Sequence, residues 1–524
     1  MQDPRSIVAA MTVEEKAAQM MFVGFHGAEM PQQYAEWIER TGLGGIILFT
    51  RNVKSVEQTR TLTDAIQAAG ARSRHALPLA VGIDQEGGTV VRLSEAAGYT
   101  HLPSNMALGA AGDAALAYRA ARVMAAEMRA VGINWNLAPA LDVNNNAQNP
   151  VIGVRSYGAL PDLVSRLGSA AVLGYQAGGV AACAKHFPGH GDTAVDSHAA
   201  LPIIRHQRDR LDEVELAPFR EAIAVSVDSI MTAHVFFPAL ETEEGRPATL
   251  SRNVITGLLR QELKYEGIIT TDCLEMKAIA NTYSPEQTAL MAVEAGIDVL
   301  LVSHTWEKQQ AMFRALVEAV HSGRITEERL TESAYRIVRM KLARAMGANL
   351  PAPVGCAEHK ALALEVARQA VTVAWGADQL PLPKRVLMVL PRAVWFAQVE
   401  DSRTVLADFI DGLRSAGIEA ESVDCPLDMQ GVSVDDLARG AGPGGTVVFG
   451  AAGAARNPAQ AEVAAALAAA GCRVVVVARR LPYDLNAFPA AVAGIACYDD
   501  SPPMQRALAE VLTGQLQASG RLPV

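Results

Sequence analysis

Long apolar runs and paired cysteines are both missing from this sequence. No stretch reaches the ~18 uninterrupted apolar residues that a membrane-spanning helix needs. The six cysteines of the 524-residue chain are scattered singly, without the close pairs that zinc ribbons and redox dithiols require. We therefore expect neither a membrane partner nor a disulfide scaffold, and we interpret the cysteines as buried or free thiols in a reducing compartment.

An excess of positive charge is missing as well. The chain carries 46 Lys and Arg against 56 Asp and Glu, which gives a formal net charge of -10. Such a chain exerts no long-range attraction on nucleic acid or anionic lipid, so we expect neither as a partner. The N-terminal sequence MQDPRSIVAAMTVEEKAAQ lacks the basic start and the apolar run of a signal peptide. We expect a cytoplasmic protein, although an exported form whose signal peptide had been removed would have the same features.

What the chain does have is a regular alternation of apolar runs and helical patterns. Half of its residues are apolar, which is enough for a large core. From residue 12 to about 346, short runs rich in Val and Ile alternate with longer helical patterns, as is typical of βαβ units. The eight runs are Met20–Phe25, Gly44–Phe49, Leu79–Asp84, Ile133–Leu137, Val180–Lys185, Ser229–Thr232, Gly267–Thr271 and Gly296–Val302. They favour an α/β fold with a (β/α)8 barrel of the TIM type over residues 1–347. An open doubly wound sheet is the alternative, because counting runs does not prove closure.

A break in helical periodicity divides the chain after this region. The helical segment Thr326–Met346 is followed by GANLPAPVG, in which glycine and two prolines end the pattern. We predict a linker and one helix over residues 348–372, and a smaller α/β domain over residues 373–524. The strands expected in the smaller domain are Arg385–Leu390, Thr446–Phe449, Arg473–Ala478 and Val492–Cys497.

The densest group of polar residues follows the fifth run, in the segment KHFPGHGDTAVDSH that spans residues 185–198. It contains three His, two Asp and one Lys at the end of a strand, where the active site of a barrel lies. Asp196 is two residues from His198, so its carboxylate can hold one imidazole nitrogen while the other exchanges a proton with substrate. A solvated loop without a function is the alternative, and the clustering argues against it.

Two further groups lie at strand ends. Asp272 follows four β-prone residues in GIITTDCLEM, where it can attack an electrophilic carbon, stabilise a cation or cap a helix. Asp84 and Arg92 in GIDQEGGTVVRL, and Arg155 in NPVIGVRSYG, can make charge-assisted hydrogen bonds to the hydroxyl groups of a polar substrate. For the arginines, a solvated surface charge without a ligand is the alternative interpretation.

With these motifs in hand, the sequence resembles the β-N-acetylhexosaminidases of glycoside hydrolase family 3. The segment KHFPGHGDTAVDSH carries the resemblance, and GIDQEGGTVVRL, NPVIGVRSYG and GIITTDCLEM support it in the family's order. The resemblance implies a barrel followed by an α/β sandwich domain. It also implies a retaining exo-β-N-acetylglucosaminidase that removes non-reducing terminal GlcNAc from muropeptides or chitin-type oligosaccharides, without a metal or another cofactor.

The resemblance also assigns roles to residues. Asp272 would be the nucleophile that forms a covalent glycosyl-enzyme, His198 the acid/base and Asp196 its partner. The positions that would bind the sugar's hydroxyls are Asp84, Arg92, Arg155, Lys185 and His186, whereas His190 and Asp192 are expected to be structural. A phosphorylase in which phosphate replaces water is the main alternative function. A metal-dependent hydrolase that uses the His and Asp residues as ligands, and a non-catalytic sugar-binding protein, are the remaining alternatives.

Overall fold

The structure is a computed structural model, and it describes residues 3–194, 197, 200–345, 353–392 and 406–524. Two of the predicted catalytic residues, Asp196 and His198, lie outside the described residues. The predicted end of the barrel at residue 347 lies outside them as well. Within the described part of the chain, no helix is long and apolar enough to cross a membrane.

The first sheet is a ring of eight parallel strands in the order β10-β1-β2-β3-β6-β7-β8-β9. A bridge between Thr270 and Val299 joins β9 to the residue before β10 and closes the ring. The prediction of a barrel is therefore confirmed, and the open sheet is not what forms. Every strand overlaps one of the eight predicted runs: β1 (Met21–Val23), β2 (Gly45–Leu48), β3 (Ala80–Ile83), β6 (Trp135–Asn136), β7 (Ala181–Phe187), β8 (Ser229–Thr232), β9 (Ile268–Thr271) and β10 (Leu300–Val302).

Helices surround the barrel, so its strands are buried on both faces and most of their residues are apolar. Polar residues begin several of the helices: Ser55 caps α4, and Ser284 and Gln287 form a capping box at α11. The helices of this unit are α1 (Pro4–Ala9), α2 (Val13–Gln19), α3 (Gln32–Thr41), α4 (Val56–Ala71), α5 (Asn105–Ala111), α6 (Ala114–Ala130), α7 (Pro161–Ala177), α8 (Arg208–Glu213), α9 (Ala217–Ala224), the π-helix η5 (Asn253–Glu262), α10 (Lys277–Ala280), α11 (Pro285–Ala295), α12 (Trp306–His321) and α13 (Glu327–Ala345).

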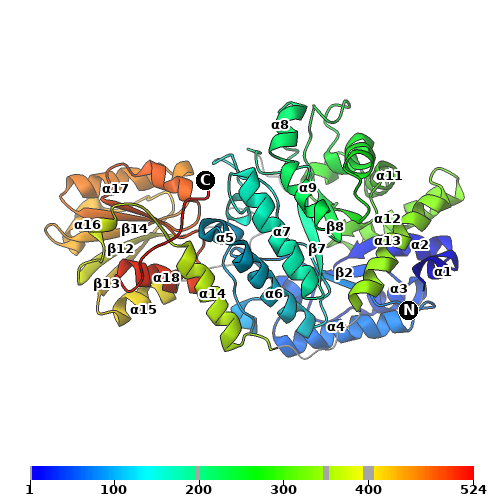
Figure 1. Cartoon of the computed structure of the whole chain (residues 1–524), viewed down its shortest axis with the longest axis horizontal. Coiled ribbons are helices and arrows are strands. Elements are labelled where there is room, and N and C mark those ends of the chain that lie inside the picture. Colours follow the sequence, from blue (N-terminus) through cyan, green and yellow to red (C-terminus); the bar gives the residue numbers. More distant parts are fainter. Residues whose placement is uncertain (1–2, 195–196, 198–199, 346–352, 393–405) are drawn as a thin grey trace.

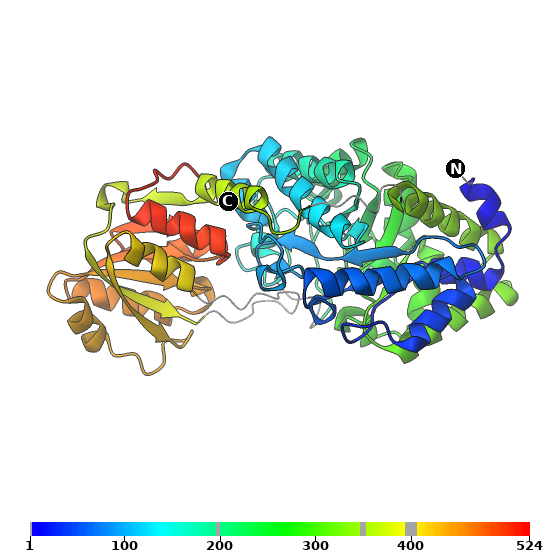
Figure 2. The ribbon, with the colours of Figure 1, turned by 90° about the horizontal axis from the view of Figure 1, so that it is seen from below.

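The second sheet forms a separate α/β unit beside the barrel (Figure 1). Its six strands have the order β11-β16-β15-β14-β12-β13, and all pair in parallel except β11. The helix α14 (Ala357–Ala370) precedes this sheet and lies along the junction of the two units, against α5, α6 and α18 (Figure 2). The strands are β11 (Thr372–Trp375), β12 (Arg385–Pro391), β13 (Glu419–Cys425), β14 (Thr446–Ala451), β15 (Arg473–Ala478) and β16 (Ala493–Ala496), and the helices are α15 (Ala407–Ser415), α16 (Val434–Ala441), α17 (Ala459–Ala469) and α18 (Pro502–Leu512).

Two strands of the second sheet were not expected from the sequence. Both β11 and β13 are edge strands, so each is paired on one side only. The sequence of β13, EAESVDC, has five exposed positions out of seven and no continuous apolar run. Runs of apolar residues identify strands that are buried. They therefore do not identify an edge strand whose side chains are exposed to solvent.

Candidate active site

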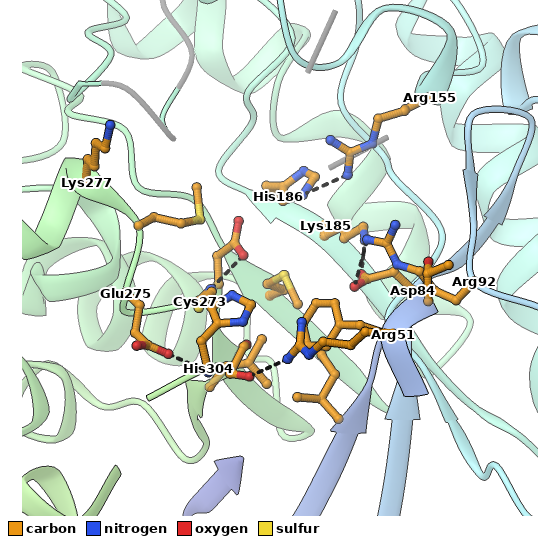
Figure 3. Close-up of a pocket in the computed structure, with 18 residues that line it drawn as sticks. Arg51, Asp84, Arg92, Arg155, Lys185, His186, Cys273, Glu275, Lys277 and His304 are labelled. Carbon is orange, nitrogen blue, oxygen red and sulfur yellow. Dashed lines mark hydrogen bonds and ion pairs between the residues drawn. The ribbon is translucent and has the colours of Figure 1, made fainter. Parts of the chain in front are cut away.

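A cavity of about 450 Å³ lies at the C-terminal ends of the barrel strands (Figure 3). This is the end of the barrel at which catalytic residues gather in enzymes with this fold. Residues from widely separated parts of the sequence meet here because each follows a different strand. The predicted site residues that line the cavity are Asp84, Arg92, Arg155, Lys185, His186 and Asp272.

One side of the cavity is built on a buried network of charges. Lys185 places its Nζ 2.8 Å from Oδ1 of Asp84 and 2.6 Å from Oε1 of Glu86. The Nε and Nη2 atoms of Arg155 each donate to one oxygen of the Glu86 carboxylate at 2.9 Å, so the contact is bidentate. Arg92 lies farther away, with Nη2 3.7 Å from Oδ2 of Asp84. The network holds several hydrogen-bond donors and acceptors in fixed positions at the cavity wall.

The charges in this network balance one another. Burial alone would raise the pKa of Glu86, but Arg155 and Lys185 outweigh burial and hold that pKa well below its usual range. Burial would lower the pKa of Lys185, but Asp84 and Glu86 raise it above the ordinary value. Both cations and the Glu86 carboxylate therefore stay charged at neutral pH.

Glu86 was not among the site residues predicted from the sequence. It lies in a short hairpin, β4 (Gln85–Gly87) and β5 (Val90–Val91), that follows β3. Its side chain is only 1% exposed, and its partner Arg155 is 69 positions away in the sequence. The available signal was its place in GIDQEGG, one residue after Gln85 and two after Asp84.

His186 is held in place by Asp142, a polar residue after β6 for which no individual role was predicted. Its Nδ1 lies 2.7 Å from Oδ2 of the fully buried Asp142, while Nη2 of Arg155 lies 3.3 Å from its Nε2. A guanidinium can only donate, so Nε2 accepts and the imidazole proton sits on Nδ1. Burial would raise the pKa of Asp142, but His186 outweighs this and lowers it. Asp142 thus fixes both the tautomer and the orientation of His186.

Neighbouring residues of a regular strand point to opposite faces, yet both Lys185 and His186 line the cavity. The reason lies in β7, whose register against β8 shifts between Ala184 and Phe187. Such a bulge re-aims the side chains next to it. The strand therefore delivers two consecutive side chains to one site.

Asp272 is the carboxylate that β9 delivers to the cavity. Its Oδ1 accepts the backbone N–H of Cys273 at 2.6 Å, which fixes the rotation of the carboxylate. The next helix, α10, begins at Lys277 and has Met276 at its N-cap position. The alternative that Asp272 caps a helix is therefore wrong, because the chain continues for four residues before a helix starts.

Arg51, Cys273, Glu275 and His304 also line the cavity (Figure 3). Arg51 donates to the carbonyl oxygen of Ser303 at 2.8 Å, and its guanidinium lies 4.2 Å from the centre of the Phe49 ring. Glu275 accepts the backbone N–H of His304 at 2.6 Å, in keeping with a structural role. Burial raises the pKa of Cys273 to about 11, so its thiol stays protonated and is a poor nucleophile at neutral pH.

Several described residues of the loop after β7 form hydrogen bonds that hold the loop in place. His190 contacts Thr193 Oγ1 at 2.9 Å and Ser197 Oγ at 3.0 Å, and burial lowers its pKa to about 4. Asp192 bonds to His206. The carbonyl oxygen of Ser197 accepts the N–H of Ala278 in α10 at 3.3 Å. His190 and Asp192 thus engage neighbouring loop residues, and neither lines the cavity.

We expect Glu86→Gln to weaken both the fold and the site. Removing one partner of a buried charged group costs about 3 kcal/mol of unfolding free energy, because Arg155 and Lys185 lose their shared anion. The pKa of Glu86 is lowered by folding, so its contribution is complete above the unfolded pKa of ~4.3 and is lost as the pH falls. Denaturant unfolding at several pH values measures this, and the difference from wild type should narrow below pH ~4.

Glu365→Gln is the matched control, because Glu365 pairs with Arg119 at the surface. An exposed pair contributes at most about 1 kcal/mol, so this variant should unfold like wild type. If both substitutions lowered the free energy of unfolding by the same small amount, the stabilising contacts of Glu86 with Arg155 and Lys185 would be contradicted.

In the described part of the chain, no group of three His, Cys, Asp or Glu side chains is arranged as metal ligands would be.

Comparison with known proteins adds independent information. The family model described as the glycosyl hydrolase family 3 N terminal domain matches residues 12–340. The beta-hexosaminidase A of Pseudoalteromonas piscicida is 33% identical, and the match covers 94% of this chain and 91% of that protein. A beta-hexosaminidase of Alkalilimnicola ehrlichii is 37% identical over 56% of this chain and 84% of its own length. The solved structure of a glycoside hydrolase family 3 beta-N-acetylglucosaminidase from Paenibacillus sp. str. FPU-7 is 44% identical, with a TM-score of 0.92, and the match covers 98% of this chain and 99% of that one.

Proposed function

Because this chain belongs to glycosyl hydrolase family 3, we propose that it is a retaining exo-β-N-acetylglucosaminidase that removes GlcNAc from the non-reducing end of its substrate. The chain is a glycoside hydrolase, and the printed names of its similar relatives support the choice of N-acetylhexosaminide substrates. The observation that carries the proposal is the position of the Asp272 carboxylate. It lines the same cavity as the network of Asp84, Lys185 and Arg155.

The proposed first step is an attack by a carboxylate oxygen of Asp272 on the anomeric carbon of the sugar. The new bond joins this oxygen to the anomeric carbon. At the same time the bond between the carbon and the leaving oxygen breaks, and the leaving oxygen takes up a proton from His198. In the second step water attacks the same carbon, His198 takes a proton from the water, and the bond to Asp272 breaks. Two displacements at one carbon give net retention of configuration.

The network on the other side of the cavity is proposed to bind the sugar's hydroxyl groups. Asp84 offers acceptor oxygens, whereas Lys185 and Arg155 offer donors whose directions are fixed by Glu86. Groups that are already ordered lose little entropy when the substrate binds. Arg92 and His186 line the same cavity and are assigned to the same task.

Assignment of the acid/base to His198, with Asp196 as its partner, is likewise a proposal. Support comes from Ser197, the residue between them, which is 3% exposed and bonded to Ala278 of α10. The residues just before this helix line the cavity. An imidazole with an unperturbed pKa of ~6.5 can donate a proton and later accept one at neutral pH.

For the aglycone we propose a cell-wall fragment or a chitin-type oligosaccharide. One assay tests the function: purified protein is offered GlcNAc linked to anhydro-N-acetylmuramic acid, chitobiose and an aryl β-glucoside, each with and without phosphate. We expect release of free GlcNAc from the N-acetylglucosaminides and little cleavage of the glucoside. Formation of GlcNAc 1-phosphate would instead identify a phosphorylase, and loss of activity in excess chelator would identify a metal-dependent hydrolase. Binding without turnover would identify a non-catalytic sugar-binding protein.

A further inference from the structure

The second α/β domain contacts the barrel at the loop that carries Arg155. The hydrophobic core around the second sheet includes Met106, Ala107 and Ala110 of α5, together with Val154, the neighbour of Arg155. Domains that move independently usually meet through smaller and more polar surfaces. The segment that presents Arg155 is therefore packed into the core of the second domain as well as attached to the barrel.

We propose that the second domain is a positioning element of the sugar site, and that Tyr483 and Asp499 hold the segment from which Arg155 reaches Glu86. The inference rests on the proposed function, because it requires Arg155 to bind the substrate. It assigns to the second domain a part in the chemistry of the barrel, although none of the second domain's described residues lines the cavity.

The first connection begins at Tyr483 in the 3-10 helix η8 (Pro482–Ala487). Its hydroxyl donates to the carbonyl oxygen of Asn144 at 2.7 Å. Asn144 is only 1% exposed, and its Oδ1 accepts the backbone N–H of Gly153 at 3.1 Å. Gly153 begins the 3-10 helix η3 (Gly153–Arg155), so this connection ends on the same turn as Arg155.

Packing strengthens this connection. The backbone of Gly153 has a φ of 46°, and a Cβ added there would lie 3.2 Å from Cδ2 of Leu481. Leu481, which precedes η8, therefore packs directly on the Gly153 backbone. The other end of the connection is fixed too, because the Asp484 carboxylate accepts the N–H groups of Gly453 and Ala455 at 2.7 and 3.1 Å.

The second connection begins at Asp499, which follows β16. Its Oδ2 accepts the backbone N–H of Ser104, the N-cap of α5, at 2.6 Å. The next residue, Asn105, donates from Nδ2 to the carbonyl oxygen of Arg155 at 2.7 Å. Two loops of the second domain thus act on the backbone of Arg155, one through Gly153 at the start of η3 and one at its end.

This arrangement matters because the contact of Arg155 with Glu86 depends on direction. Nε and Nη2 of the Arg155 guanidinium must each face one oxygen of the Glu86 carboxylate. Nη2 also contacts Nε2 of His186. A displacement of about 1 Å is enough to disturb such a site. Loss of the hydrogen bonds made by Tyr483 or Asp499 is therefore expected to raise KM more than it lowers kcat.

Tyr483→Phe tests the inference, because it removes only the hydroxyl that donates to Asn144. We expect KM for an aryl N-acetyl-β-glucosaminide to rise about three- to tenfold, with kcat within about twofold of wild type. Tyr335→Phe on α13 is the matched control and should leave both constants unchanged. Asp499→Ala should also raise KM, because it removes the oxygen that accepts the backbone N–H of Ser104.

A double variant distinguishes an effect of Tyr483 through Arg155 from an independent effect on substrate binding. If Tyr483 acts through Arg155, adding Tyr483→Phe to Arg155→Lys should raise KM by less than about twofold beyond Arg155→Lys alone. Multiplication of the two separate effects, or an unchanged KM in Tyr483→Phe, would overturn the inference.

Hydrogen exchange of the peptide 149–158 gives a readout that does not depend on turnover. We expect faster exchange in Tyr483→Phe than in Tyr335→Phe, and equal rates would overturn the inference. A wild-type protein that cleaves no N-acetyl-β-glucosaminide would refute the proposed function instead, while the exchange rates would still decide whether the second domain holds this segment.

Discussion

Asp272→Ala is expected to lower kcat by at least about a thousandfold on any N-acetyl-β-glucosaminide, because it removes the atom that attacks the anomeric carbon. The fold should survive, since Asp272 is only half-buried at the end of β9 and the alanine variant keeps the backbone N–H that donates to the carbonyl oxygen of Thr232. Single-turnover kinetics measures the loss, and thermal unfolding measures the stability.

Asp64→Ala, at an exposed position of α4, is the matched control and should retain wild-type kinetics. The assignment of Asp272 would be contradicted by a variant that keeps more than about a tenth of the wild-type kcat. A variant that loses activity together with its cooperative unfolding would leave the rate uninformative, so we also propose Asp272→Asn, which preserves size and shape.

His198→Ala is expected to divide substrates by the quality of their leaving group. A 4-nitrophenolate departs without a proton, so kcat/KM for the nitrophenyl substrate should fall by less than about tenfold. A sugar alkoxide needs the proton, so kcat/KM for chitobiose should fall by about a hundredfold or more. Steady-state kinetics with both substrates measures this difference.

The second step of the reaction should slow as well in His198→Ala, because water loses its base. We expect a glycosylated protein to accumulate with the nitrophenyl substrate, which intact mass spectrometry would detect, and small anions such as azide to restore turnover. His321→Ala, at an exposed position near the end of α12, is the matched control. Equal losses with both substrates would contradict the role of His198 as the acid.

Much of this architecture follows from local sequence patterns. The barrel strands are buried on both faces, so their apolar runs mark them directly, and β8 was located to the residue as Ser229–Thr232. Because strand ends meet at one face of a barrel, the position of Asp272 relative to Asp84 and Lys185 could be anticipated without any contact between distant residues being known.

What the sequence does not reveal are the contacts between residues far apart. The roles of Glu86 and Asp142 become apparent only from their contacts with Arg155 and His186. The bracing of Arg155 by Tyr483 joins positions more than 300 residues apart and has no periodic pattern. Propensity and spacing act along the chain, whereas these features depend on packing between two domains.

The stereochemistry of the reaction tests the central claim most directly. Proton NMR of a wild-type reaction, recorded before the released sugar equilibrates, identifies the anomer that forms first. Attack by Asp272 followed by attack of water predicts that β-GlcNAc appears first. If α-GlcNAc appears first, a single displacement has occurred, and Asp272 is not the nucleophile.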